Sequence, residues 1–233
     1  MALSKNDFIE IEYIGRIKNS HVFDTNIKEE AKKINLEIET NPLIICLGQN
    51  MILPAIDLFL IGKKPGAYTL DLEPEKAFGL RKQELVKTFS LNAFRKQNIA
   101  PAPGMIFSFD NLFGKITSVS SGRVIVDFNN PLAGKQIEYK IIVKRQVTEL
   151  NEKIKALLAF YMRKDLNFEI KDKKLIVNAT RHESKLLEFF KKKFKDILNL
   201  ELEIKEIQEK KESVEQKVNP GKDAQTISKE DDL

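Results

Sequence analysis

The spacing of the apolar residues changes near residue 150, and this change constrains the fold more than any other feature of the chain. Before it, short runs alternate apolar with polar residues, as in 8–17 (FIEIEYIGRI). After it, apolar residues recur every three or four positions in 150–164 and 182–198. A period of two is typical of a half-buried strand, and the longer period is typical of an amphipathic helix. We therefore predict an α+β protein whose first half is mainly sheet.

Strand-type runs dominate residues 1–147, with one short helix that carries Ile56 and Leu60 inward. Residues 26–41 are polar and helix-prone, and we interpret them as a surface excursion. This half therefore predicts an antiparallel sheet with a helix on one face. The predicted strands are 8–17, 43–47, 68–72 and 137–143, together with a hairpin in 114–128 that turns at Ser120, Ser121 and Gly122.

Residues 148–208 predict a compact α-β-β-α-β domain. Its first helix, 150–164, places Leu150, Ile154, Leu157 or Leu158, and Tyr161 on one stripe. Strands follow at 166–170 and 174–178, then the helix 182–198 with Leu187, Phe190, Phe194 and Ile197 on one face, and a last strand with Leu200, Leu202 and Ile204. From 209 to 233 the sequence is polar, and we predict a disordered tail.

The composition excludes several classes of chemistry. Cys46 is the only cysteine, so no internal disulfide can form. With His21 and His182 as the only histidines, a transition-metal site or Ser-His catalysis is not expected, and we predict no metal and no cofactor. The chain has no run of 18 apolar residues and no signal peptide, which favours a cytoplasmic protein with no membrane partner. A net charge of +5 is too small an excess to indicate specific nucleic-acid recognition.

Five short motifs occur in an order that resembles a known family. They are Tyr13-Ile14-Gly15, Phe23-Asp24, the segment from Leu47-Gly48 to Gly62, Glu73 to Gly79 (EPEKAFG), and the later NNPLAGK…IEYKIIV. Together they resemble the FKBP-type peptidyl-prolyl cis/trans isomerases. The position of 80–127 resembles the insert-in-flap chaperone domain of the SlyD-like subgroup, and 148–208 looks like the extra C-terminal domain of the long archaeal members.

The resemblance implies a fold and a domain organisation. The fold is an antiparallel sheet wrapped on a short helix, with a small β-rich insert and a C-terminal α-β-β-α-β domain. The domains would be an isomerase domain in 1–79 and 128–147, the insert in 80–127, the C-terminal domain in 148–208 and the tail in 209–233.

The resemblance also implies a pocket for the prolyl ring. Phe23, Ile56 and Tyr139 would form its floor and walls, the backbone N–H of Leu53 would hold the substrate carbonyl, and Asp24 beside the Tyr13 hydroxyl would orient the polar rim. The family often has Trp where this chain has Ile56, and Tyr where it has Phe78, so the resemblance implies isomerisation more strongly than macrolide binding. The full set is Tyr13, Phe23, Asp24, Leu43, Ile52, Leu53, Ile56, Phe78 and Tyr139.

The segment 80–127 carries many apolar residues for its length. A segment of about fifty residues buries only a small part of its surface, so some of these side chains should form an exposed patch that binds unfolded clients. The expected client-binding residues are Leu85, Val86, Phe89, Leu91, Phe94, Ile106, Phe107, Phe109, Leu112 and Phe113.

Other interpretations of the same residues stay open. Without the family pattern, Tyr13, Phe23, Ile56 and Tyr139 would be ordinary core residues, and Asp24 a turn former. Three functions follow: an isomerase that also binds unfolded or partly folded proteins containing X-Pro bonds, a holdase without turnover, or a ribosome- or RNA-associated factor working through its basic C-terminal helix.

Overall fold

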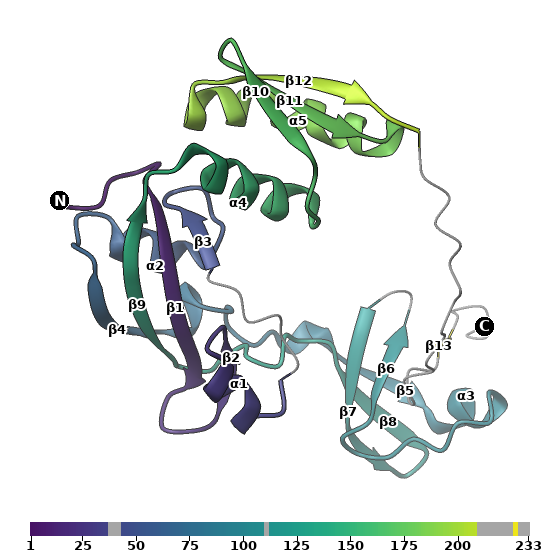
Figure 1. The fold of residues 1–233 in the computed structure, drawn as a ribbon. Coiled ribbons are helices and arrows are strands. Elements are labelled where there is room, and N and C mark those ends of the chain that lie inside the picture. The colour runs from purple at the N-terminus through teal and green to yellow at the C-terminus, as the bar shows by residue number, and fades with distance from the viewer. Residues whose placement is uncertain (37–42, 110–111, 209–225, 228–233) are drawn as a thin grey trace. The chain divides into compact units, whose positions relative to one another are not determined.

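A computed structural model describes residues 1–36, 43–109, 112–208 and 226–227 of the chain (Figure 1). The chain divides into two compact units. The first unit combines Met1–Ala77 with Gln136–Ser213, and the second combines Phe78–Lys135 with Val214–Leu233. Both units contain mixed α and β structure with antiparallel strand pairs, as the alternation of apolar residues predicts.

The first unit is built on two long antiparallel strands. β1 (Phe8–Ile17) pairs along its whole length with β9 (Ile137–Val147), which extends four residues past the predicted end at 143. β4 (Gly66–Leu72) pairs with β9, while β3 (Leu43–Cys46) and β2 (Val22–Thr25) pair with the first and second parts of β1. The strands predicted at 8–17, 43–47 and 68–72 are confirmed within two residues.

The prediction of a single short helix in the first 147 residues is wrong. Besides the expected α2 (Pro54–Leu60), which buries Ile56 and Leu60, this part contains α1 (Lys28–Lys33) and α3 (Leu91–Lys96). α3 forms because Ser90 caps its N-terminus, accepting a hydrogen bond from the Asn92 N–H, and because Phe94 on its inner face is buried. Residues 37–41 of the predicted surface excursion 26–41 lie outside the described residues.

The last part of the first unit is a helix-and-sheet layer, here called the C-terminal layer. Its elements are α4 (Leu150–Met162), β10 (Phe168–Lys171), β11 (Lys174–Ala179), α5 (Arg181–Leu198) and β12 (Glu201–Glu206). β10 and β11 are antiparallel, whereas β11 and β12 are parallel and connected through α5. The prediction that Leu150 belongs to the apolar stripe of α4 is wrong. Leu150 is exposed because it is the first residue of the helix.

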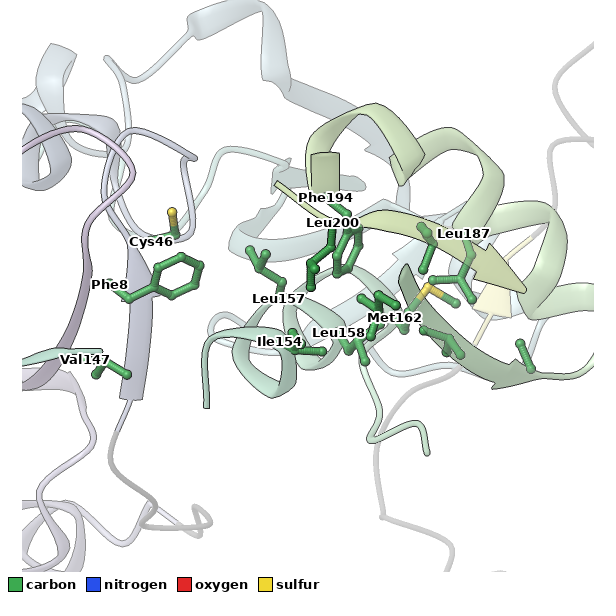
Figure 2. Packing of buried hydrophobic residues seen from close by; sticks show 14 residues of the cluster. Phe8, Cys46, Val147, Ile154, Leu157, Leu158, Met162, Leu187, Phe194 and Leu200 are labelled. Carbon is green, nitrogen blue, oxygen red and sulfur yellow. The ribbon is translucent and has the colours of Figure 1, made fainter. Parts of the chain in front are cut away.

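One hydrophobic cluster joins the C-terminal layer to the first sheet. Figure 2 shows Phe8, Cys46 and Val147 from β1, β3 and β9 on one side of it. On the other side lie α4 and α5 side chains, including Leu157 and Phe194. Residues 148–208 therefore share a core with the sheet that precedes them.

The second unit contains a separate sheet. β6 (Ile106–Phe109), β7 (Leu112–Ser120), β8 (Arg123–Asp127) and β5 (Val86–Ser90) follow one another in that order, and β13 (Thr226–Ile227) pairs in parallel with β6. The predicted hairpin turn is confirmed, with Ser121 and Gly122 in the left-handed region at φ 47° and 75°. Short 3₁₀ turns at Pro74–Lys76 and Gln83–Leu85 precede β5. The rest of the predicted tail, 209–225 and 228–233, lies outside the described residues.

Candidate functional site

Three aromatic rings meet on the first sheet. The Tyr139 ring on β9 is 6.1 Å from the Phe23 ring on β2, edge to face, and 6.2 Å from the Tyr13 ring on β1. Tyr139 is only 5% exposed, and Tyr13 and Phe23 are half-buried. The predicted residues Tyr13, Phe23 and Tyr139 thus form one aromatic cluster, although Tyr139 is more than a hundred positions from the other two in sequence.

Gly15 explains how these rings come so close to the sheet. It is paired with Tyr139 on one side and with Asp24 on the other. A Cβ at Gly15 would lie 2.9 Å from Tyr139 Cε1 and 3.0 Å from Phe23 Cζ, so the two rings occupy the place of its missing side chain. The β1–β2 register shifts after Gly15, and such a bulge redirects the side chain of the extra residue, here Phe23.

Sequence reasoning placed Gly15 in the family motif but did not include it in the site. The available signal was a glycine inside an otherwise regular strand pattern, which often marks a close approach of another group to the backbone. We add Gly15 to the candidate site on the strength of these contacts.

A hydroxyl and a carboxylate form the polar edge of the cluster. The Tyr13 hydroxyl donates to Asp24, at 3.2 Å from Oδ2 and 3.3 Å from Oδ1. Burial raises the pKa of Asp24, and the Tyr13 hydrogen bond opposes that rise. Burial, and then the Asp24 charge, raise the pKa values of Tyr13 and Tyr139, so both hydroxyls stay protonated at neutral pH.

The backbone of Tyr13 is held by Thr25 and Asn26, two residues that the sequence analysis did not place in the site. The Thr25 hydroxyl donates to the Tyr13 carbonyl at 2.6 Å. The Asn26 side chain accepts from the Tyr13 N–H at 2.8 Å and donates to the Ile11 carbonyl at 2.9 Å. These bonds fix the strand that carries Tyr13 against the turn after Asp24.

Three further predicted residues lie at the start of α2 or just before it, and a fourth, Leu43, lies on β3. Leu43 on β3 and Ile52 in the following loop are half-buried, and Ile56 is buried on the inner face of α2. Leu53 is the N-cap of α2 and Pro54 is its first residue. Proline is favoured there because the first helical N–H has no partner within the helix. Phe78 falls in the second unit.

A buried carboxylate holds the loop before α2, and sequence reasoning missed it. Asp57 is buried and accepts hydrogen bonds from the backbone N–H groups of Asn50, at 3.0 Å, and Gly48. Burial raises its pKa, and the two backbone donors partly offset this. Its Oδ1 is a buried atom without a hydrogen-bond partner among the described residues.

The second unit divides the expected client-binding residues into a core and a surface. Phe94 and Phe107 belong to its hydrophobic core with Ile116, Val124 and Val126, so the expectation of exposure is wrong for both. Phe89 and Leu91 are half-buried against the same core, and Val86 is half-buried on β5. The side chain of Phe109 lies outside the described residues.

The other four expected residues keep accessible apolar side chains. Leu112 and Phe113 at the start of β7 are 64% and 67% exposed, and Ile106 on β6 is 55% exposed. Leu85 before β5 is also exposed, as is Met105, which sequence reasoning did not include. Ile106 and Phe113 lie on the same face of the sheet, because Ser108 pairs with Phe113 and residues two apart share a face.

Across the residues that the structure describes, no three His, Cys, Asp or Glu side chains form a group that could hold a metal ion. None of the described helices has the length and apolar character needed to cross a membrane.

Comparisons with known proteins give the family. A family model described as FKBP26, IF domain, matches residues 89–132. A short-type peptidyl-prolyl cis-trans isomerase of Methanocaldococcus jannaschii is 30% identical over 146 residues, which are 61% of this chain and 92% of that protein. An FKBP-type 16 kDa isomerase of Escherichia coli is 32% identical over 108 residues, 44% of this chain and 72% of that protein. The SlyD isomerase of Treponema pallidum is 28% identical over 116 residues, 48% of this chain and 65% of that protein. The chain belongs to the FKBP-type peptidyl-prolyl cis-trans isomerases.

Proposed function

We propose that this chain isomerises X-Pro peptide bonds at the aromatic cluster of the first unit and holds unfolded client chains on the second unit. The observation that carries the first part is the ring arrangement at Gly15, where the Tyr139 and Phe23 rings occupy the place of the missing side chain and the Tyr13 ring lies beside Tyr139. The family membership independently supports the same reaction.

An apolar site can catalyse this reaction without a nucleophile or a base. Amide resonance makes the X-Pro bond resist rotation and makes its planar form the more polar one. Twisting the bond removes the charge separation and leaves the lone pair on the prolyl nitrogen. A pocket that excludes water therefore favours the twisted form over the planar form, which lowers the barrier by differential binding.

The described residues can supply this chemistry in distinct roles. Phe23, Tyr139 and Ile56 would line the space for the prolyl ring. The backbone N–H of Leu53 would donate to the substrate carbonyl, and Asp24, kept in place by Tyr13, would contact the polar backbone at the rim. Leu43 and Ile52 would complete the apolar lining, with Ile56 weakening macrolide binding relative to Trp.

A proline-limited refolding assay tests the reaction. Uncatalysed X-Pro isomerisation takes tens to hundreds of seconds, so a refolding protein with a native cis-proline shows a slow phase. Catalytic amounts of this chain should accelerate that phase and also the isomerisation of a short tetrapeptide. If neither rate changes, the chain is a holdase without turnover.

The second part of the proposal concerns clients. The exposed apolar residues Ile106 and Phe113 lie on one face of a small sheet, and Leu112 next to Phe113 is also exposed; exposed apolar surface usually marks binding sites. Edge strands can in addition pair with an extended chain through backbone hydrogen bonds, which do not depend on client sequence. Partners would be unfolded or partly folded proteins with X-Pro bonds, which the second unit would keep near the first through a covalent connection.

This part is tested separately from the reaction. The full chain should suppress aggregation of a reduced, unfolded protein, and it should catalyse refolding of that protein more efficiently than isomerisation of a tetrapeptide. If the chain is active on the tetrapeptide but has no effect on aggregation, the isomerase proposal stands and the client-binding proposal is wrong.

A further inference from the structure

The loop between β3 and α2, residues 47–53, is held from two sides. It carries Ile52 and Leu53, the residues proposed to line the pocket and to hold the substrate carbonyl. Gly48 and Asn50 both have left-handed backbone conformations, with φ of 76° and 55°. Glycine and asparagine are the residues that adopt this conformation most readily, so both positions suit a tight turn.

The first set of contacts comes from the isomerase sheet and α2. The Asp57 carboxylate accepts from Asn50 and Gly48, and the Leu47 N–H donates to the Asp7 carbonyl at 2.9 Å. These contacts lie within 1–79 and belong to the isomerase domain alone.

The second set comes from the C-terminal layer. The Met51 side chain packs against the hydrophobic cluster that α4 and α5 share with the first sheet, while its sulfur accepts from the Cys46 N–H of that sheet at 3.1 Å. The Gln49 side chain accepts from Lys193 Nζ on α5 at 2.9 Å and donates to Asn6 at 2.8 Å. Gln49 is therefore bound to the C-terminal layer, and Met51 packs against the cluster that this layer shares with the first sheet.

We propose that Met51 and Gln49 are positioning residues through which the C-terminal layer sets the backbone of Ile52 and Leu53. Met51 is two residues from Leu53, and Leu53 is fixed on its other side as the N-cap of α2. A shift of the Met51 backbone would therefore displace Ile52 and the N–H of Leu53. A displaced Leu53 N–H would hold the substrate carbonyl less well in the apolar pocket and so lower kcat/KM.

This inference rests on the proposed isomerase activity, and its alternative is that Met51 merely fills the core. A matched pair of variants separates the two. Met51→Ala and Met162→Ala remove the same atoms from the same hydrophobic cluster, but Met162 is the last residue of α4 and is not part of the loop. Met51→Leu restores the volume and tests rescue.

The experiment measures kcat and KM of the full-length variants on a tetrapeptide, at a temperature where circular dichroism shows each to be folded. We expect Met51→Ala to lower kcat/KM by about threefold or more, with Met51→Leu close to wild type and Met162→Ala changed by less than about 1.5-fold. Equal losses in Met51→Ala and Met162→Ala, or no loss in either, would overturn the proposal.

Two further measurements keep the test independent of activity and of folding. Backbone amide shifts of Ile52 and Leu53 in NMR spectra should move in Met51→Ala and stay in place in Met162→Ala, even if the wild-type chain proved inactive on the tetrapeptide. Lys193→Met should move the same signals, whereas Lys192→Met, an exposed lysine beside it on α5, should not. Unchanged signals in both Met51→Ala and Lys193→Met would refute the coupling.

Discussion

Gly15 and Tyr139 face each other across β1 and β9, and the Tyr139 ring lies where the side chain of any other residue at position 15 would begin. The 2.9 Å separation from a Cβ at Gly15 is shorter than an ordinary van der Waals contact. The shape of the proposed pocket therefore depends on the absence of a single methyl group.

Gly15→Ala should displace the Tyr139 ring and lower isomerase activity. Overpacking of this kind costs about 1–3 kcal/mol of unfolding free energy. Denaturant unfolding measures the loss, and a double-mutant cycle identifies its source. Because Tyr139→Leu removes the ring, Gly15→Ala should cost clearly less in that background, and an equal cost in both backgrounds would mean that the ring is not what the methyl group meets.

The apolar rings should matter more for turnover than the carboxylate does. Phe23→Ala and Tyr139→Ala should lower kcat/KM more than Asp24→Ala, because the proposed rate effect comes mainly from excluding water. Folding must be checked first, since large-to-small changes at buried sites cost about 2–5 kcal/mol. A folded Asp24→Ala protein with an equal or greater loss of activity would reverse this order.

Asp24 should make the first unit less stable as the pH rises. Its pKa in the folded chain is above the ordinary value of 3.8, so the folded state holds the proton more tightly than the unfolded state. The stabilisation is fully present below the unfolded pKa and is lost as the pH rises through the folded pKa. Between pH 3.5 and 7 the unfolding free energy of the wild type should therefore fall more than that of Asp24→Asn. All other titratable groups are the same in the two proteins, so the difference reports Asp24. Denaturant unfolding at both pH values measures it.

Tyr13→Phe should raise the pKa of Asp24 further. The Tyr13 hydroxyl donates to the carboxylate and lowers its pKa, so its removal leaves the effect of burial unopposed. The carboxyl carbon shift of Asp24, followed by NMR against pH, gives the pKa in both proteins. A lower or equal value in Tyr13→Phe would show that the hydrogen bond is not formed in solution.

Phe113→Ser should weaken client binding while leaving tetrapeptide isomerisation unchanged. Among the expected client residues whose side chains the structure describes, Phe113 is the most exposed. Leu58→Ser on α2 is the matched control, because Leu58 is a similarly exposed apolar residue on the first unit. Suppression of aggregation should fall in Phe113→Ser and persist in Leu58→Ser, whereas equal behaviour of the two variants would move the client site elsewhere.

The chain should bind neither nickel nor zinc tightly. Its only histidines, at positions 21 and 182, are far apart in sequence, and the segment 209–233 contains no His or Cys. Carboxylates and lysines are poor ligands for these ions. Calorimetry should show no site with a dissociation constant below about 1 μM, the range in which imidazole or thiolate sites would be expected.

The sequence determined the local structure and the family. The strand 8–17 and the helix 182–198 are encoded by the spacing of their own apolar residues, and the order of the motifs from Tyr13 to Phe78 gave the family without any tertiary contact. α3 was missed because its six residues are too few to show a helical period, and its formation depends on the burial of Phe94 by residues of other elements.

Only the tertiary structure decided which side chains meet. Phe107 and Phe113 lie in similar apolar runs, yet one is buried and the other exposed, because sheet pairing sends them to opposite faces. The approach of Tyr139 to Gly15 and the hydrogen bond from Lys193 to Gln49 join residues that are distant along the chain. The periodic pattern of a segment predicts which of its side chains are buried. It does not predict which residues they contact, because those contacts form between segments that are distant in sequence.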